Sequence, residues 1–260
     1  MAKKILLISG HGAGDSGATA KINGKTYKEA DEAIVMVKKI KTALDPYDVS
    51  VELYPTNRNA YEDAKAGKLK KDLSKYDYIL EIHFNACVND LKGDGKSTGT
   101  EAYVTTSDTS IKTEKYMVSN LAALGFRNRG VKSHNWTVIN RAKIAGADSC
   151  LLEVCFIDDA DDMKIYLKSK DRVASNIALG VASGLNLKKK SNKKKKVATL
   201  CVGARVKIKA GAIDENTKKE YSKFVYTTVY TVIYIKDGCV AFGLNGVATG
   251  RTKIENVTLV

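Results

Sequence analysis

Residues 4–12 read KILLISGHG, an apolar run that ends in a glycine-rich turn carrying His11. A short, continuous run of isoleucine and leucine is typical of a strand that is buried on both faces. Glycines after the run let the backbone bend sharply and can bring the imidazole of His11 to the rim of a sheet. The run is too short for the core of a signal peptide, and His11 and Asp15 follow it at once. We therefore expect the first strand of a sheet here rather than a secretion signal.

Similar apolar runs recur along residues 1–187, where they alternate with stretches of helical periodicity. This alternation predicts an α/β domain with a mostly parallel, twisted sheet that is flanked by helices. In open sheets of this kind the functional site lies at the carboxyl ends of the strands. The predicted strands are 4–9, 49–54, 78–84, 101–105 and 150–156, and the predicted helices are 27–44, 109–124, 159–168 and 171–185.

The composition changes at residues 188–196, KKKSNKKKK, which contain seven lysines and no acidic residue. Like charges repel one another, so this stretch predicts a solvated linker between two domains. Beyond it, residues 197–260 contain short β-rich runs that are divided by Asp-Gly at 237–238 and Asn-Gly at 245–246. Such pairs favour hairpin turns. We expect a small all-β barrel at 197–260, after the α/β domain at 1–187.

Composition narrows the class of protein further. Hydrophobic residues make up 44% of the 260, and no apolar stretch approaches the roughly 20 residues of a membrane span. The five cysteines are scattered and odd in number, so disulfides are not expected to define the fold. The net charge of +14 favours a polyanionic partner, either a nucleic acid or a bacterial wall that carries anionic polymers.

Two of the three histidines lie where polar side chains are costly. His11 follows the first predicted strand, and His83 lies inside another apolar strand, in EIHFNA at 81–86. His83 shares one face of that strand with Glu81 and Asn85, and this polar trio needs partners. Two imidazoles at strand ends suit a catalytic zinc site if a carboxylate joins them. The alternatives are a loop histidine at His11 and a hydrogen-bonded core histidine at His83.

Glu29 is the carboxylate that we expect to complete this set. At 100° per residue it lies on the apolar stripe that runs from Ala33 to Leu44 and faces the sheet, whereas Glu32 lies at the edge of that stripe. The alternative is that Glu29 closes a capping box that begins at Thr26.

Glu153 is the most unusual residue of the chain, because both faces of its strand, LLEVCF at 151–156, are otherwise apolar. An uncompensated carboxylate there would cost several kcal/mol. A nearby dication or a raised pKa would remove the problem, and both suit a general base or acid beside a metal ion. A salt bridge to a lysine or arginine is the structural alternative. His134 is not expected to be a ligand, and Trp136 suits either a groove wall or the core.

The order of these motifs, Gly-His-Gly, Glu, His-x-Asn-Ala and Leu-Glu-x-x-Phe, resembles the zinc-dependent N-acetylmuramoyl-L-alanine amidases of the amidase-3 family. The resemblance covers most of residues 3–187. It includes DSGA at 15–18, GTE at 99–101 and NRGVK at 128–132. It implies an amidase-3-like fold for the first domain.

The resemblance also implies a reaction, the hydrolysis of the amide bond between N-acetylmuramic acid and L-alanine in peptidoglycan. One zinc ion would be bound by His11, Glu29 and His83, with Glu153 as the catalytic glutamate. Glu153 would take a proton from water and deliver it to the departing alanine amine.

Residues 224–233, FVYTTVYTVI, are similar to the SH3-like wall-binding module of clostridial phage endolysins. A tandem of amidase, linker and small β module implies a lysin that binds the Gram-positive cell wall. Such a protein would be made in the host cytoplasm without a signal peptide and would act at the wall after release.

Other functions fit parts of the same pattern. A zinc carboxypeptidase or a deacetylase acting on cell-wall amides would use the same metal ligands. A basic polyanion-binding protein without enzymatic activity would explain the charge. No RNP, helix-turn-helix or zinc-finger signature occurs in the sequence, so no nucleic-acid partner is expected. The sequence leaves the oligomeric state open.

Overall fold

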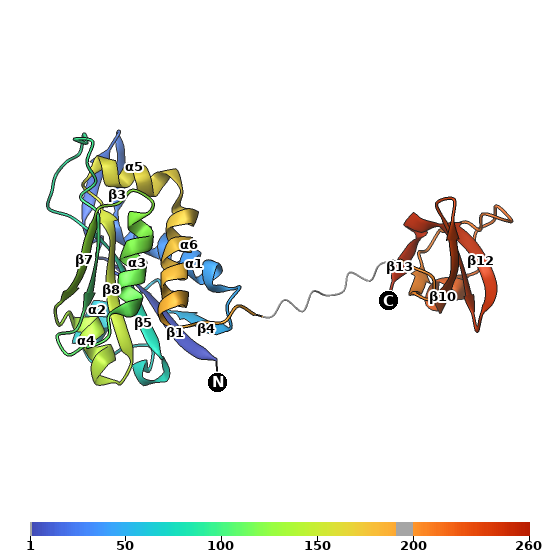
Figure 1. The fold of residues 1–260 in the computed structure, drawn as a ribbon, viewed down its shortest axis with the longest axis horizontal. Coiled ribbons are helices and arrows are strands. Elements are labelled where there is room, and N and C mark those ends of the chain that lie inside the picture. The colour runs from blue at the N-terminus through green and yellow to red at the C-terminus, as the bar shows by residue number, and fades with distance from the viewer. Residues whose placement is uncertain (1, 191–199) are drawn as a thin grey trace. The chain divides into compact units, whose positions relative to one another are not determined.

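The computed structural model describes residues 2–190 and 200–260, and the chain divides into two compact units, Met1–Lys190 and Ser191–Val260 (Figure 1). Residues 191–196 of the predicted linker lie outside the described residues. The preceding lysines are attached to the first unit, because Lys190 N–H donates to Pro46 O and Asp48 N–H donates to Lys188 O, both at 2.8 Å. Backbone groups form such bonds whatever side chain the residue carries, so the charge of the run does not prevent this pairing.

A six-stranded sheet forms the centre of the first unit, in the order β4-β1-β5-β8-β6-β7. Neighbouring strands are parallel except for β6, which runs antiparallel to β8. The predicted α/β class is confirmed, with a sheet that is largely parallel. The strands are β1 (Lys3–Ser9), β4 (Val49–Leu53), β5 (Tyr78–Asn85), β6 (Thr100–Val104), β7 (Asn128–Ser133) and β8 (Asp148–Phe156).

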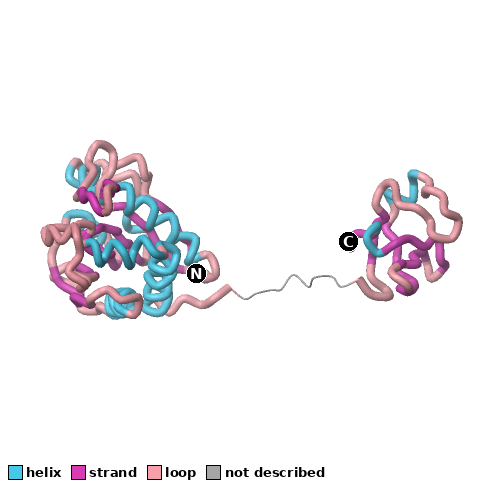
Figure 2. The backbone as a smooth tube through the Cα atoms, turned by 90° about the horizontal axis from the view of Figure 1, so that it is seen from above, coloured by secondary structure: helices cyan, strands magenta, loops and turns pink. Residues whose placement is uncertain are grey.

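Helices cover both faces of this sheet. Figure 1 shows α1 (Glu29–Leu44), α3 (Lys112–Ala122) and α6 (Lys170–Gly184) together over one face. The other face packs against α2 (Ala60–Lys65) and α4 (Thr137–Ile144), while α5 (Ala160–Lys168) follows the end of β8. Figure 2 shows the same chain from above, with helices in cyan and strands in magenta. Among the described residues, no helix has both the length and the apolar character needed to cross a bilayer.

Side chains of the central strands alternate between two cores. Ile5 and Leu7 of β1 belong to the larger core under α1, α3 and α6, whereas Leu6 and Ile8 pack toward α2 and α4. This alternation follows from the two-residue period of a strand. Because both faces are covered, the strands are apolar nearly throughout, and any polar side chain near their carboxyl ends stands out.

The helix that carries Glu29 begins later than the sequence pattern predicts. Residues Thr19–Ile22 (β2) and Lys25–Lys28 (β3) form an antiparallel hairpin, and α1 starts only at Glu29. The hairpin turns at Asn23 and Gly24, whose φ angles of 49° and 80° suit a tight turn of this kind. Thr26 therefore lies in a strand, and Lys28 before the helix makes no side-chain cap, so the capping-box alternative for Glu29 is wrong.

The second unit has a separate small core that includes Tyr230 and Phe242. Its antiparallel strands follow the order β12-β11-β10-β9-β13. Within residues 200–260 no pairing joins β12 to β13, so the SH3-like barrel stays a prediction. The elements of this unit are β9 (Arg205–Ile208), α7 (Lys223–Thr227), β10 (Val229–Lys236), β11 (Cys239–Leu244), β12 (Val247–Lys253) and β13 (Val257–Leu259), with a 3-10 turn at Ile254–Asn256. The first unit has a 3-10 turn of its own at Leu73–Lys75.

Candidate metal centre and active site

A cavity of about 480 Å³ opens near the carboxyl ends of β1, β5 and β8, where an α/β sheet is expected to hold its site. All four predicted site residues line it: His11, Glu29, His83 and Glu153. The rest of the wall is largely apolar or aromatic. Its members include Tyr61, Phe84, Trp136, Val138 and Leu151.

The turn after β1 brings the two imidazoles together. His11 has a φ of 62°, and Gly12 after it has a φ of 122°. The left-handed region costs a side-chain-bearing residue about 1 kcal/mol or more, so the turn is held by its surroundings. Gly10 has no Cβ, and one built there would overlap the ring of His83. The two imidazole centroids consequently lie 5.0 Å apart.

Glu29 lies between the two histidines at the start of α1. Its Oε2 is 3.2 Å from His11 Nε2, and its Oε1 is 2.8 Å from His83 Nδ1. The same oxygens accept backbone N–H groups, from Ala18 at 2.9 Å and from Phe84 at 3.0 Å. Burial by itself would raise the pKa of Glu29, but the hydrogen bonds with His11 and His83 outweigh it and hold that pKa well below its usual range.

A second carboxylate faces the outer nitrogen of each imidazole. Asp15 Oδ2 is 2.7 Å from His11 Nδ1, and Asp15 is itself held by Gly17 N–H at 2.9 Å and the Asn59 amide at 3.1 Å. Glu81 Oε1 is 3.4 Å from His83 Nε2, and Glu81 is only 4% exposed. Such outer carboxylates commonly fix the orientation of metal-binding histidines.

The donor set fits a zinc ion. One ligand atom from each of His11, Glu29 and His83 lies within 4.8 Å of the others, and two imidazoles with one carboxylate are a common catalytic zinc set. Each imidazole has a carboxylate beside both of its nitrogens, as a hydrogen-bonded core histidine would, and the role of His11 and His83 as metal ligands stays a prediction. The arrangement leaves the rest of the cavity open for water and a substrate.

Glu32, the other candidate carboxylate of α1, points elsewhere. Its Oε2 accepts the Tyr166 hydroxyl at 2.7 Å and pairs with Lys170 Nζ at 2.5 Å. This contact ties α1 to α5 and α6. Glu32 is therefore occupied in the core, and Glu29 is the carboxylate of this helix that faces the histidines.

Glu153 lies on β8 directly beside His83 in the strand register. Its Oε2 is buried and has no hydrogen-bond partner among the described residues. Burial raises the pKa of Glu153 to about 7. The cations that could have formed the alternative salt bridge, Arg129 and Lys132, pair instead with Glu101 Oε2 at 2.6 Å and 2.5 Å. With a pKa near 7, the Glu153 carboxyl can gain or lose a proton near neutral pH.

Some contributors to the site were missed from the sequence. Asp15 was noted only as a polar residue after the first strand and as part of a family motif, and Glu81 as one member of a polar trio without an assigned partner. Asn59 carried no signal at all, because it comes from the N-cap of α2, a helix that was not predicted. Trp136 lines the cavity and is 44% exposed, whereas the His134 ring packs at a tilt against Trp136, with centroids 4.3 Å apart, and does not line the cavity.

A second group of acidic residues differs in kind. Asp90, Asp94 and Asp161 also offer oxygens within 4.8 Å of one another, but no imidazole joins them. Asp90 accepts Gly93 N–H and Asp94 N–H, each at 2.9 Å, and Asp161 accepts Gly95 N–H at 2.7 Å. These carboxylates shape a glycine-rich loop.

Comparison with known proteins points to one family. The family model described as N-acetylmuramoyl-L-alanine amidase matches residues 5–183. An endolysin of Bacillus phage SPP1 is 33% identical over 200 residues, which cover 74% of this chain and 69% of that protein. The N-acetylmuramoyl-L-alanine amidase CwlM of Bacillus licheniformis is 30% identical over 189 residues, covering 70% and 67%. The catalytic domain of the amidase CwlV from Bacillus (Paenibacillus) polymyxa var. colistinus superposes with a TM-score of 0.56 at 25% identity, covering 72% of this chain and 99% of that domain.

Proposed function

This chain belongs to the family of N-acetylmuramoyl-L-alanine amidases, and we propose that it works through a zinc ion held by His11, Glu29 and His83. Its reaction is the hydrolysis of the amide bond between N-acetylmuramic acid and L-alanine in peptidoglycan. Family membership sets aside the carboxypeptidase, deacetylase and non-enzymatic alternatives. The observation that carries the metal proposal is the convergence of these three donors, with a further carboxylate behind each imidazole.

The zinc ion, when bound, supplies a Lewis acid that polarises the substrate carbonyl and acidifies a water molecule. Glu29 holds its charge at all ordinary pH values because its hydrogen bonds keep its pKa low. Asp15 and Glu81 hold the outer nitrogens of the imidazoles, so that the inner nitrogens face Glu29.

Glu153 is the proposed general base and acid. Its unpartnered Oε2 lies at the cavity beside His83, and its raised pKa lets it take a proton from water and then return it to the alanine amine. Tyr61 and Trp136, each 44% exposed, offer aromatic contacts for the sugar and the first residues of the stem peptide.

The second unit, residues 197–260 in the sequence prediction, is the proposed cell-wall-binding module. Its separate core supports a self-contained role, and the similarity to a phage endolysin supports a lysin that is made in a host cytoplasm and acts on the wall. Tethering by such a module would raise the local concentration of the amidase at its substrate.

Digestion of purified Gram-positive peptidoglycan tests the proposal. We expect new alanine amino termini and no new reducing sugar ends, with activity lost on chelation and restored by zinc. Reducing ends would indicate a glycosidase, and activity that survives complete removal of metal would overturn the zinc assignment.

A further inference from the structure

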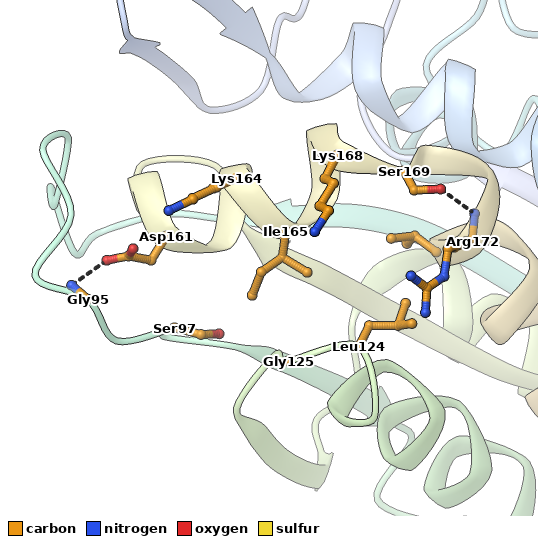
Figure 3. Close-up of a pocket in the computed structure, with 11 residues that line it drawn as sticks. Gly95, Ser97, Leu124, Gly125, Asp161, Lys164, Ile165, Lys168, Ser169 and Arg172 are labelled. Atoms are coloured by element: carbon orange, nitrogen blue, oxygen red, sulfur yellow. Dashed lines mark hydrogen bonds between the residues drawn. The ribbon is translucent and has the colours of Figure 1, made fainter.

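A second cavity of about 360 Å³ lies in the first unit, where α5 meets α6 (Figure 3). It is lined by the loop at Gly95 and Ser97, by the turn after α3 at Leu124, and by the two helices. It shares no lining residue with the amidase cavity. Nothing in the proposed reaction uses it.

Three cationic side chains line this cavity: Lys164, Lys168 and Arg172. None of them forms a salt bridge with any described residue, unlike Lys170 between them, which pairs with Glu32. The acidic member of the wall is Asp161, whose Oδ2 accepts Gly95 N–H at 2.7 Å, and Asp90 and Asp94 lie beside it with oxygens within 4.8 Å of one another. In Figure 3 the Lys168 and Arg172 side chains extend from the helices toward the space around Ile165 and Leu124.

The three cationic side chains are exposed to solvent, so water screens their mutual repulsion and an incoming anion can reach them. Lys164 and Lys168 are four residues apart on α5, which places their like charges on neighbouring turns of one helix face. Leu124 and Ile165, which are partly buried against the core, add apolar surface to the same cavity. An anion with several oxygen atoms could contact more than one of these cations and accept the planar fork of Arg172.

We propose that this cavity binds phosphodiester groups of an anionic wall polymer. A polymer suits the geometry because the cations follow one another along α5 and into α6, with a rise of about 6 Å between Lys164 and Lys168. A flat lipid surface suits it less, since the loop at Gly95 and the segment at Leu124 wall the recess. The choice of a wall polymer as the ligand rests on the proposed function. Binding of a phosphate group rests only on the cations that line the cavity.

The test compares two double variants of the full chain. Lys168→Ala/Arg172→Ala removes two cations of the cavity, and Lys38→Ala/Lys41→Ala removes two unpaired, exposed lysines of α1 as a matched control. Affinity for poly(glycerol phosphate) is measured by calorimetry, alongside inorganic phosphate and phosphatidylglycerol vesicles. Amidase activity is measured on peptidoglycan stripped of phosphate polymers, and thermal unfolding checks the fold.

We expect the cavity variant to bind the polymer about tenfold more weakly, and the control variant to bind it as wild type does. Both variants should keep full activity on stripped peptidoglycan. This assay tests the proposed amidase function independently of polymer binding by the cavity. Equal losses in both variants would show diffuse attraction by net charge and overturn the site. Undiminished polymer binding by the cavity variant would also overturn it, and tighter binding to the vesicles than to the polymer would replace the polymer by a lipid surface.

Discussion

Glu153 provides the sharpest test at the scale of single residues. Glu153→Gln keeps the size of the side chain but removes its capacity to take a proton. We expect activity to fall by about 10²- to 10⁴-fold, the usual contribution of a positioned general base, while one zinc ion per chain is retained. Release of alanine amino termini and metal analysis of the same sample measure the two effects. A fully active Glu153→Gln protein would remove this residue from the mechanism.

The protonation of Glu153 should depend on the metal. Burial raises its pKa to about 7 in the absence of an ion, so the carboxyl is protonated below that pH and becomes a base above it. A dication nearby favours the carboxylate, and zinc should therefore lower this pKa. Titration of the labelled carboxyl by NMR, with and without zinc, measures the shift. An unchanged midpoint would mean that the ion binds away from Glu153.

Asp15 acts through His11 rather than on the substrate. Asp15→Asn weakens the contact with His11 Nδ1, which lies 2.7 Å away, and leaves the three proposed ligands in place. Loss of such an outer partner typically costs about 10- to 100-fold in metal affinity. Competition with a chelator measures this cost, and Asp45→Asn at the exposed end of α1 serves as the control. Equal affinities for both variants would leave Asp15 without a role in metal binding.

At the scale of elements, the carboxyl ends of β1, β5 and β8 position the side chains of the site, and a glycine after β1 lets the His83 ring approach the backbone. A Cβ at Gly10 would overlap the His83 ring, so Gly10→Ala should displace that imidazole and abolish zinc binding. Gly24→Ala is the control, since a Cβ there meets nothing within 4 Å and its cost is limited to the strained turn. Zinc binding and thermal unfolding of both variants distinguish a local effect from general unfolding. Normal zinc binding by Gly10→Ala would contradict this packing argument.

The elements that were predictable from sequence are those with strong apolar periodicity. The central strands and the long helices were found within a few residues of their ends, because burial on both faces leaves a continuous apolar run. The β2–β3 hairpin was missed although Asn23-Gly24 is a turn signal, since the helical pattern after it was extended backward to Tyr27. Helix α4 and strand β7 were missed because short, half-exposed elements carry little periodicity of their own.

The site could be predicted in part for a related reason. An ionisable residue inside an apolar strand stands out in a sequence, as His83 and Glu153 did. Contacts between distant segments leave no such mark. The Asn59 amide reaches Asp15 across 44 residues, and Glu101 draws Arg129 and Lys132 into one ionic group on neighbouring strands. Only the folded arrangement shows that these cations pair with Glu101, and that Glu153 Oε2 has no hydrogen-bond partner within residues 2–190 and 200–260.

At the scale of the whole molecule, the two units have separate cores, and their proposed roles should separate as well. A chain ending at Lys190 keeps the three proposed metal ligands and the cavity that they line. We expect it to cleave a soluble muropeptide at the wild-type rate but to bind intact Gram-positive walls about 10²-fold more weakly, because a tether multiplies the effective concentration of its partner. Sedimentation with purified walls and hydrolysis of the soluble substrate measure these properties independently. Equal wall binding by the full and shortened chains would assign recognition of the wall to the first unit, where the Lys168→Ala/Arg172→Ala variant would then test the cationic cavity.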